Sequence, residues 1–100
     1  MPFTDLTSHK RRPVLVLSKK AYNLISDDII VAAVTSVIDT KPYAVSISND
    51  DMEEGTLRVM SCVRSDKIYT LSQALIIKRF GKVSSKILEM VKAQINGLLE

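Results

Sequence analysis

A chain of 100 residues gives room for one domain with one hydrophobic core, so we expect a single domain over residues 1–100. Hydrophobic residues make up 46% of the chain, charged residues make up 25%, and no apolar run approaches the roughly 18 residues that a membrane-spanning helix needs. Lys and Arg outnumber Asp and Glu by 14 to 11, and the resulting net charge of +3 suits a polyanionic partner without requiring one.

Cysteine and histidine are scarce in this sequence. Cys62 is the single cysteine, so an intrachain disulfide is excluded, and its apolar neighbours predict a small buried side chain in a reducing compartment. His9 is the single histidine, which excludes a multi-histidine metal site, and no Cys and His spacing resembles a zinc site. The N-terminus shows no charged region followed by an apolar run. We therefore expect a cytoplasmic protein that uses neither a metal nor a cofactor.

The first part of the chain alternates between polar loops and short apolar runs. Residues 2–12 are polar and rich in turn-forming side chains, which indicates a loop. Residues 14–17 form a continuous β-prone run after Pro13, a residue that suits the first position of a strand. Residues 18–28 indicate a loop with a brief helical turn, and 29–34 predict a second buried strand that ends at Thr35 and Ser36.

The middle of the chain indicates further short strands. Residues 43–48 alternate between apolar and small polar side chains, as a half-buried strand does. The acidic stretch 49–55 predicts a loop or hairpin connection. More strands are predicted at residues 56–63, 67–71 and 75–78, with a helical turn at 72–74 and Gly81 closing the last strand.

The C-terminal segment changes from strand to helix periodicity. After Ser84 or Ser85 as N-cap, apolar residues recur at helical spacing, namely Ile87, Leu88, Val91, Ile95, Leu98 and Leu99. This pattern predicts a helix that covers a sheet or lies in a dimer interface. Several short strands followed by one helix predict a mainly β fold with helices (α+β), of a small barrel-like kind.

Four segments in order resemble the MazF/PemK toxins of toxin–antitoxin systems. They are Pro2-Phe3-Thr4-Asp5-Leu6 leading to Arg12-Pro13, Ile30 to Ser36 (IVAAVTS), Ser61 to Leu71 (SCVRSDKIYTL, with its Arg-x-Asp), and Gly81-Lys82-Val83 before the helix. Together they cover nearly the whole chain. The resemblance implies a small SH3-like, CcdB-type β-barrel with a C-terminal helix.

One departure from the family pattern lies at the start of the chain. Family members usually begin with a strand of the Gly-Asp-Ile-Val-Leu-Val type ahead of the segment that matches residues 2–6, whereas this sequence starts with Met1-Pro2-Phe3. Either the start codon is misplaced or this form lacks the usual first strand. A missing strand would leave an unpaired sheet edge.

The resemblance implies a type II toxin that acts as a metal-independent, sequence-preferring endoribonuclease. Its substrate would be single-stranded RNA, cut by transesterification through the ribose 2′-OH. Its partners would be a second copy in a homodimer and an acidic, partly disordered cognate antitoxin. A gyrase poison like CcdB is one alternative, weakened because CcdB relies on a C-terminal Trp-Gly-Ile and this chain has no tryptophan. A catalytically silent RNA- or protein-binding remnant of the same fold is another.

The candidate catalytic residues are Arg12, Thr35, Arg64 and Asp66. Arg12 offers a permanently charged, planar fork for phosphate oxygens, and the alternative for it is a solvated loop charge. The Thr35 hydroxyl could hold a phosphate oxygen or the 2′-OH, or could instead make local backbone hydrogen bonds. Arg64 and Asp66 would point to one side of an extended strand and could share acid–base work, or could form a simple surface ion pair.

Further side chains are expected to contact RNA. The predicted RNA-binding residues are Lys10, Arg11, Ser36 and Lys67. The aromatic rings of Tyr22, Tyr43 and Tyr69 could stack on splayed bases, although alternation with Val45 and Ile47 favours core packing for Tyr43. His9 matches no position of the family pattern and is expected to be a solvent-facing loop residue.

Overall fold

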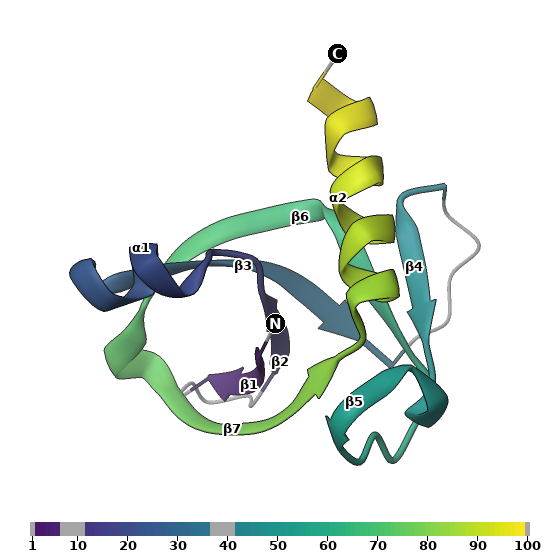
Figure 1. The fold of residues 1–100 in the computed structure, drawn as a ribbon, viewed down its shortest axis with the longest axis horizontal. Helices are drawn as coiled ribbons and strands as arrows, with labels where there is room; N and C mark the ends of the chain where they lie inside the picture. The colour runs from purple at the N-terminus through teal and green to yellow at the C-terminus, as the bar shows by residue number, and fades with distance from the viewer. Residues whose placement is uncertain (1, 7–11, 37–41, 100) are drawn as a thin grey trace.

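The computed structural model describes residues 2–6, 12–36 and 42–99, which form a curled antiparallel sheet with two helices (Figure 1). The strands are β1 (Pro2–Leu6), β2 (Pro13–Val16), β3 (Asp28–Thr35), β4 (Ala44–Ile47), β5 (Met52–Gly55), β6 (Ser61–Ser72) and β7 (Ile76–Val83). The helices are α1 (Lys20–Ile25) and α2 (Ser85–Leu99), with short 3₁₀ turns η1 (Asn49–Asp51) and η2 (Gln73–Leu75).

The seven strands lie in the order β4-β6-β3-β2-β1-β7-β5, and every pair is antiparallel. The sheet bends strongly, and β6, β3 and β7 run around its curve in Figure 1. Pairing between the outer strands β4 and β5 is not detected among the described residues, so the α+β class with a C-terminal helix holds while barrel closure does not follow from the strand pairing.

The prediction of a loop across the whole of residues 2–12 is wrong for its first part. Residues Pro2–Leu6 form β1, which pairs with β2 on one side and with β7 on the other. Strand β2 also pairs with β3, so β1 and β2 each have a neighbouring strand on both sides. The unpaired edge that a missing first strand would leave is therefore not found at β1 or β2. Long-range pairing with two strands overrides the local turn preference of the polar residues.

Side-chain alternation along the central strands separates two buried apolar clusters. The larger cluster includes Leu15 of β2 and Ala32 of β3, and it is covered by Ile87 and Val91 of α2. The residues next to them in the chain, such as Val14 and Val31, belong to a second cluster on the opposite face. Both faces of β2 and β3 are therefore packed in apolar clusters, because successive side chains point to opposite faces. Their continuous apolar runs predict this arrangement.

The C-terminal helix is confirmed at Ser85–Leu99, and its buried residues are Ile87 and Val91. Cys62 is also buried as predicted. Other local predictions are corrected. The acidic stretch 49–55, predicted as a connection, contains strand β5. Residues 56–60, predicted as the first part of a strand at 56–63, form an irregular segment before β6. The two strands predicted at 56–63 and 67–71 are replaced by the single long strand β6.

Candidate functional site

The long strand β6 is interrupted by a bulge opposite β3. Ile68 pairs with Ala32 and Arg64 pairs with Ala33, so four steps along β6 match one step along β3 and β6 carries three extra residues, 65–67. A bulge of this kind redirects the side chains on either side of it. In an unbroken strand Arg64 and Lys67 would point to opposite faces, whereas here both line the same hollow.

That hollow, which we call the cationic pocket, has a volume of about 190 Å³ and is built from three strands. Its lining residues are Arg12 and Pro13 at the start of β2, Ala33, Val34 and Thr35 at the end of β3, and Arg64, Lys67 and Tyr69 of β6. Register explains why the first two groups meet. Val14 pairs with Ala33, and continuing this antiparallel pairing places Arg12 across from Thr35.

Arg64 is held in a two-point ion pair. Its Nε donates to Asp66 Oδ1 at 2.9 Å and its Nη2 donates to Asp66 Oδ2 at 2.8 Å. The two side chains are 15% and 31% exposed, so the pair lies at the edge of the surface. Both carboxylate oxygens of Asp66 therefore accept hydrogen bonds from the guanidinium, which fixes the orientation of Arg64.

The bulge itself is anchored by Ser65, whose side chain is fully buried. Its backbone N–H donates to the Tyr43 carbonyl at 2.9 Å, and its Oγ donates to Gln94 Oε1 of α2 at 2.8 Å. One buried residue thus ties the pocket-bearing segment to both β4's leading turn and the C-terminal helix. Arg64 and Lys67 flank this anchor, so their backbone positions depend on it.

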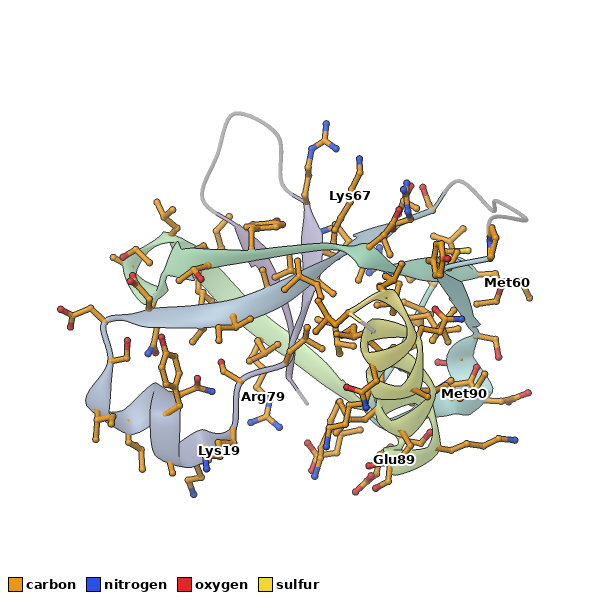
Figure 2. The ribbon with its side chains drawn as sticks, turned by 90° about the horizontal axis from the view of Figure 1, so that it is seen from above. Lys19, Met60, Lys67, Arg79, Glu89 and Met90 are labelled. Carbon is orange, nitrogen blue, oxygen red and sulfur yellow. The ribbon has the colours of Figure 1, made fainter. Side chains whose placement is uncertain are left out.

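Charge dominates the cationic pocket. Three cations, Arg12, Arg64 and Lys67, line it together with two hydroxyl-bearing side chains, Thr35 and Tyr69. Lys67 points out of the molecule on the side away from α2 (Figure 2). Burial raises the pKa of the Tyr69 phenol above its usual value, and the positive charge of Arg12 opposes that rise. The phenol is therefore neutral at physiological pH and can donate a hydrogen bond.

The structure brings together four of the residues predicted from the sequence, Arg12, Thr35, Arg64 and Lys67. Asp66 is not among the lining residues and is paired with Arg64, which is. Ser36 is exposed in a bend after β3 and does not line the pocket. The predicted RNA-binding residues Lys10 and Arg11 lie outside the described residues, as does His9.

Sequence reasoning placed Tyr69 only among three aromatic residues that could stack on bases, without a position in the site. A usable signal was present, because Tyr69 follows Lys67 by two residues in a strand and therefore shares its face. Within the described ranges, no group of three or more His, Cys, Asp or Glu side chains is placed to hold a metal ion. No helix in the described part of the chain is long and apolar enough to cross a membrane.

The family model of the PemK-like, MazF-like toxins of type II toxin–antitoxin systems matches residues 2–99. The chain belongs to this family. The match confirms the family that the four sequence segments predicted. A comparison with curated protein sequences gives no significant match.

Solved structures of MazF toxins share the fold of this toxin. The Mycobacterium tuberculosis toxin MazF-mt6 is 19% identical, with a TM-score of 0.84 over 99% of this chain and 96% of that chain. A mycobacterial endoribonuclease in complex with its cognate antitoxin is 19% identical, with a TM-score of 0.82 over 98% and 90%. MazF of a MazE-MazF structure from Deinococcus radiodurans is 25% identical, with a TM-score of 0.82 over 98% and 91%.

Proposed function

We propose that this toxin is a metal-independent endoribonuclease that cleaves single-stranded RNA by attack of a ribose 2′-OH on the adjacent phosphodiester. The observation that carries the proposal is the cationic pocket, in which Arg12, Arg64 and Lys67 converge beside the Thr35 hydroxyl. Family membership supports it, since a structural relative is described as an endoribonuclease. A preference for particular sequences would come from contacts with the bases, because phosphate contacts carry no sequence information.

The reaction needs charge stabilisation and two proton transfers. The 2′ oxygen forms a bond to phosphorus while the bond to the departing 5′ oxygen breaks, which leaves a 2′,3′-cyclic phosphate and a 5′-hydroxyl end. Negative charge grows on the non-bridging oxygens, where the guanidinium of Arg12 is the first group we assign to stabilise it. Preorganised donors at developing charge contribute about 10²–10³ in rate each.

The remaining pocket residues have supporting roles in this proposal. Thr35 holds a phosphate oxygen or the 2′-OH through its hydroxyl, and Lys67 binds phosphate as a point charge. Arg64 presents its guanidinium in the orientation that its two hydrogen bonds with Asp66 impose. Asp66 therefore acts mainly by positioning Arg64, and its own role as a base is weak.

The size of the pocket suits one segment of a polymer better than a whole small-molecule ligand. Its volume of about 190 Å³ is below the roughly 300–1,000 Å³ of typical small-molecule sites. One phosphodiester and its flanking groups would occupy it while the rest of the strand crosses the surface. Lys10, Arg11 and Ser36 are proposed to contact the strand beyond the pocket.

Partners follow from the same proposal. Relatives are described in complex with a cognate antitoxin and as MazE-MazF assemblies, which supports a cognate antitoxin for this toxin. We expect that antitoxin to be acidic and partly disordered, because its target face is basic. A homodimer is proposed as the active form, and exposed apolar residues of α2, Met90, Leu98 and Leu99, offer surface for it.

The decisive test is incubation of purified toxin with mixed-sequence single-stranded RNA in excess EDTA. We expect discrete cuts with 2′,3′-cyclic phosphate ends, and we expect Arg12→Ala to slow cutting by about 10²–10³. Arg79→Ala is the matched control. Arg79 is a half-exposed arginine paired with Glu54 outside the pocket, on the opposite side from Lys67 in Figure 2. Intact RNA from a folded sample would overturn the proposal and leave a binding-only role.

A further inference from the structure

The cationic pocket has an apolar part as well as a charged part. Besides its cations it is lined by Pro13 and Ala33, which are small and offer no side-chain hydrogen bonds, and by the ring of Tyr69. A site that bound only a phosphate would gain nothing from such a wall, since desolvating an anion against apolar surface is unfavourable. The composition is that of a site for a group with one charged and one apolar portion.

Tyr69 stands at the junction of these two portions. In the pairing of β6 with β3 it lies opposite Val31, whose side chain is fully buried. Tyr69 itself is 40% exposed, so part of the ring packs on the sheet and part remains open to the pocket. Aromatic rings bury large areas when they can, and a ring left open beside cations is not explained by core packing.

Single-stranded RNA offers both portions within one nucleotide, since each phosphate is followed by a flat base. We infer that Tyr69 is the base-binding residue of this pocket and stacks on a nucleobase adjacent to the phosphate held by Arg12. The inference rests on the proposed ribonuclease function. Stacking on an aromatic side chain tolerates any base, because each base has a π-face, so Tyr69 contributes affinity and placement.

Placement matters more than affinity for the reaction. A base fixed on Tyr69 orients the attached ribose, and the 2′-OH must approach phosphorus in line with the departing oxygen for the reaction to proceed. The ring is carried by the same bulged strand as Arg64 and Lys67. Its position relative to Arg64 and Lys67 is therefore set by the backbone of β6.

The test distinguishes the contribution of the Tyr69 ring to RNA binding from that of its hydroxyl and from a general loss of folding. Tyr69→Leu removes the ring, Tyr69→Phe keeps it, and Tyr22→Leu is the matched control in α1, outside the pocket. The cut site is first mapped with wild-type toxin. Binding is then measured with an RNA made uncleavable by a 2′-deoxy sugar at that site, and with two RNAs that each lack one base flanking the scissile phosphate.

We expect Tyr69→Leu to weaken binding of the intact RNA by about 5- to 150-fold, the loss that removing a base-stacking aromatic causes. Tyr69→Phe and Tyr22→Leu should bind normally. On one of the two abasic RNAs the difference between wild type and Tyr69→Leu should vanish. If the wild-type toxin cleaves RNA and Tyr69→Leu binds the intact RNA as tightly as wild type, the inference is overturned and the ribonuclease proposal stands.

Two further outcomes count against the inference. An equal loss in Tyr69→Phe and Tyr69→Leu would assign the effect to the phenol hydroxyl and not to stacking. A loss in Tyr69→Leu that persists undiminished on both abasic RNAs would show that no flanking base contacts the ring. Failure of wild-type toxin to cut any RNA would instead overturn the proposed function, which keeps the two failures distinct.

Discussion

Two polar hollows in this small toxin differ in how their side chains are used. The second hollow lies between the end of α1 and η2 and is lined by Asn23, Ser26, Asp27, Ser72, Gln73 and Ala74. There the Gln73 side chain donates to the backbone carbonyls of Asn23 and Ser26 at 2.9 and 2.8 Å. Its backbone N–H donates to the Asp27 carbonyl at 2.8 Å. These groups serve the fold by closing the C-terminal end of α1 onto the sheet.

The cationic pocket is organised in the opposite way. The three cations Arg12, Arg64 and Lys67 line one hollow, and charges of like sign repel one another even where Asp66 pairs with Arg64. Folding gains nothing from that arrangement, whereas an anion in the pocket would relieve it. Polarity alone therefore does not mark a functional site in this molecule. Polar groups that bond to one another stabilise the fold, and clustered like charges indicate a ligand.

The first prediction concerns the cationic pocket, where Thr35→Val should strongly slow the cleavage of RNA. The change keeps the shape of the side chain and removes its hydroxyl, so we expect cleavage to fall about 100-fold, as for loss of one preorganised donor. Thr70→Val on the exposed part of β6 is the control and should cut RNA normally. Rates are measured as initial cleavage of a defined RNA. Equal rates for both variants would remove Thr35 from the chemistry.

Part of the cationic pocket is predictable from the sequence. Arg12 and Thr35 were predictable because each stands at the end of an apolar run, and neighbouring antiparallel strands bring such ends together. The helix α2 was predictable because its apolar spacing is long and regular. These features depend on local pattern and on the family resemblance, which agree with each other.

Features that depend on distant contacts were not predictable. The bulge at residues 65–67 has no local signature, because it is fixed by the hydrogen bond from Ser65 to Gln94, 29 residues further along the chain. The Arg64–Asp66 ion pair, which the sequence offered as an alternative, is present, and a share of Asp66 in acid–base work stays a prediction. Strand β1 escaped prediction because its order comes from pairing with β2 and β7.

The second prediction concerns the hollow between α1 and η2, where a substitution should affect stability alone. Gln73→Ala removes two hydrogen bonds to partly buried carbonyls, so we expect the free energy of unfolding to fall by about 1–2 kcal/mol, roughly tenfold in the unfolding equilibrium. Urea unfolding measures this loss, and RNA cleavage by the folded variant should stay at the wild-type rate. Gln73→Glu, which cannot donate to the carbonyls, should lose as much stability. Slower cleavage by either folded variant would contradict the separation of the two hollows.

A smaller effect is expected on the salt dependence of RNA binding. Each phosphate neutralised on a single strand adds about −0.7 to the slope of log affinity against log salt, so Lys67→Ala should make the slope less steep by about 0.7. Between about 50 and 200 mM salt, the affinity loss should therefore be about threefold smaller than in wild type. Fluorescence anisotropy with uncleavable RNA measures it. Lys86→Ala, on α2, serves as the control, and an unchanged slope in Lys67→Ala would place that lysine outside the RNA contact.

The smallest effect is a change in the titration of Tyr69, and it probes the geometry of the pocket without RNA. Burial raises the pKa of this phenol and the charge of Arg12 lowers it, so removing that charge in Arg12→Ala should raise the pKa further. The chain has three tyrosines, so replacing Tyr22 and Tyr43 by Phe leaves Tyr69 as the single phenol for ultraviolet titration. Because the folded-state pKa lies above the unfolded value, stability from this group is complete below about pH 10 and is lost as pH rises through the folded pKa. A pKa that stays fixed or falls in Arg12→Ala would mean that the guanidinium does not face the ring in solution, and the phosphate and base subsites would then lie apart.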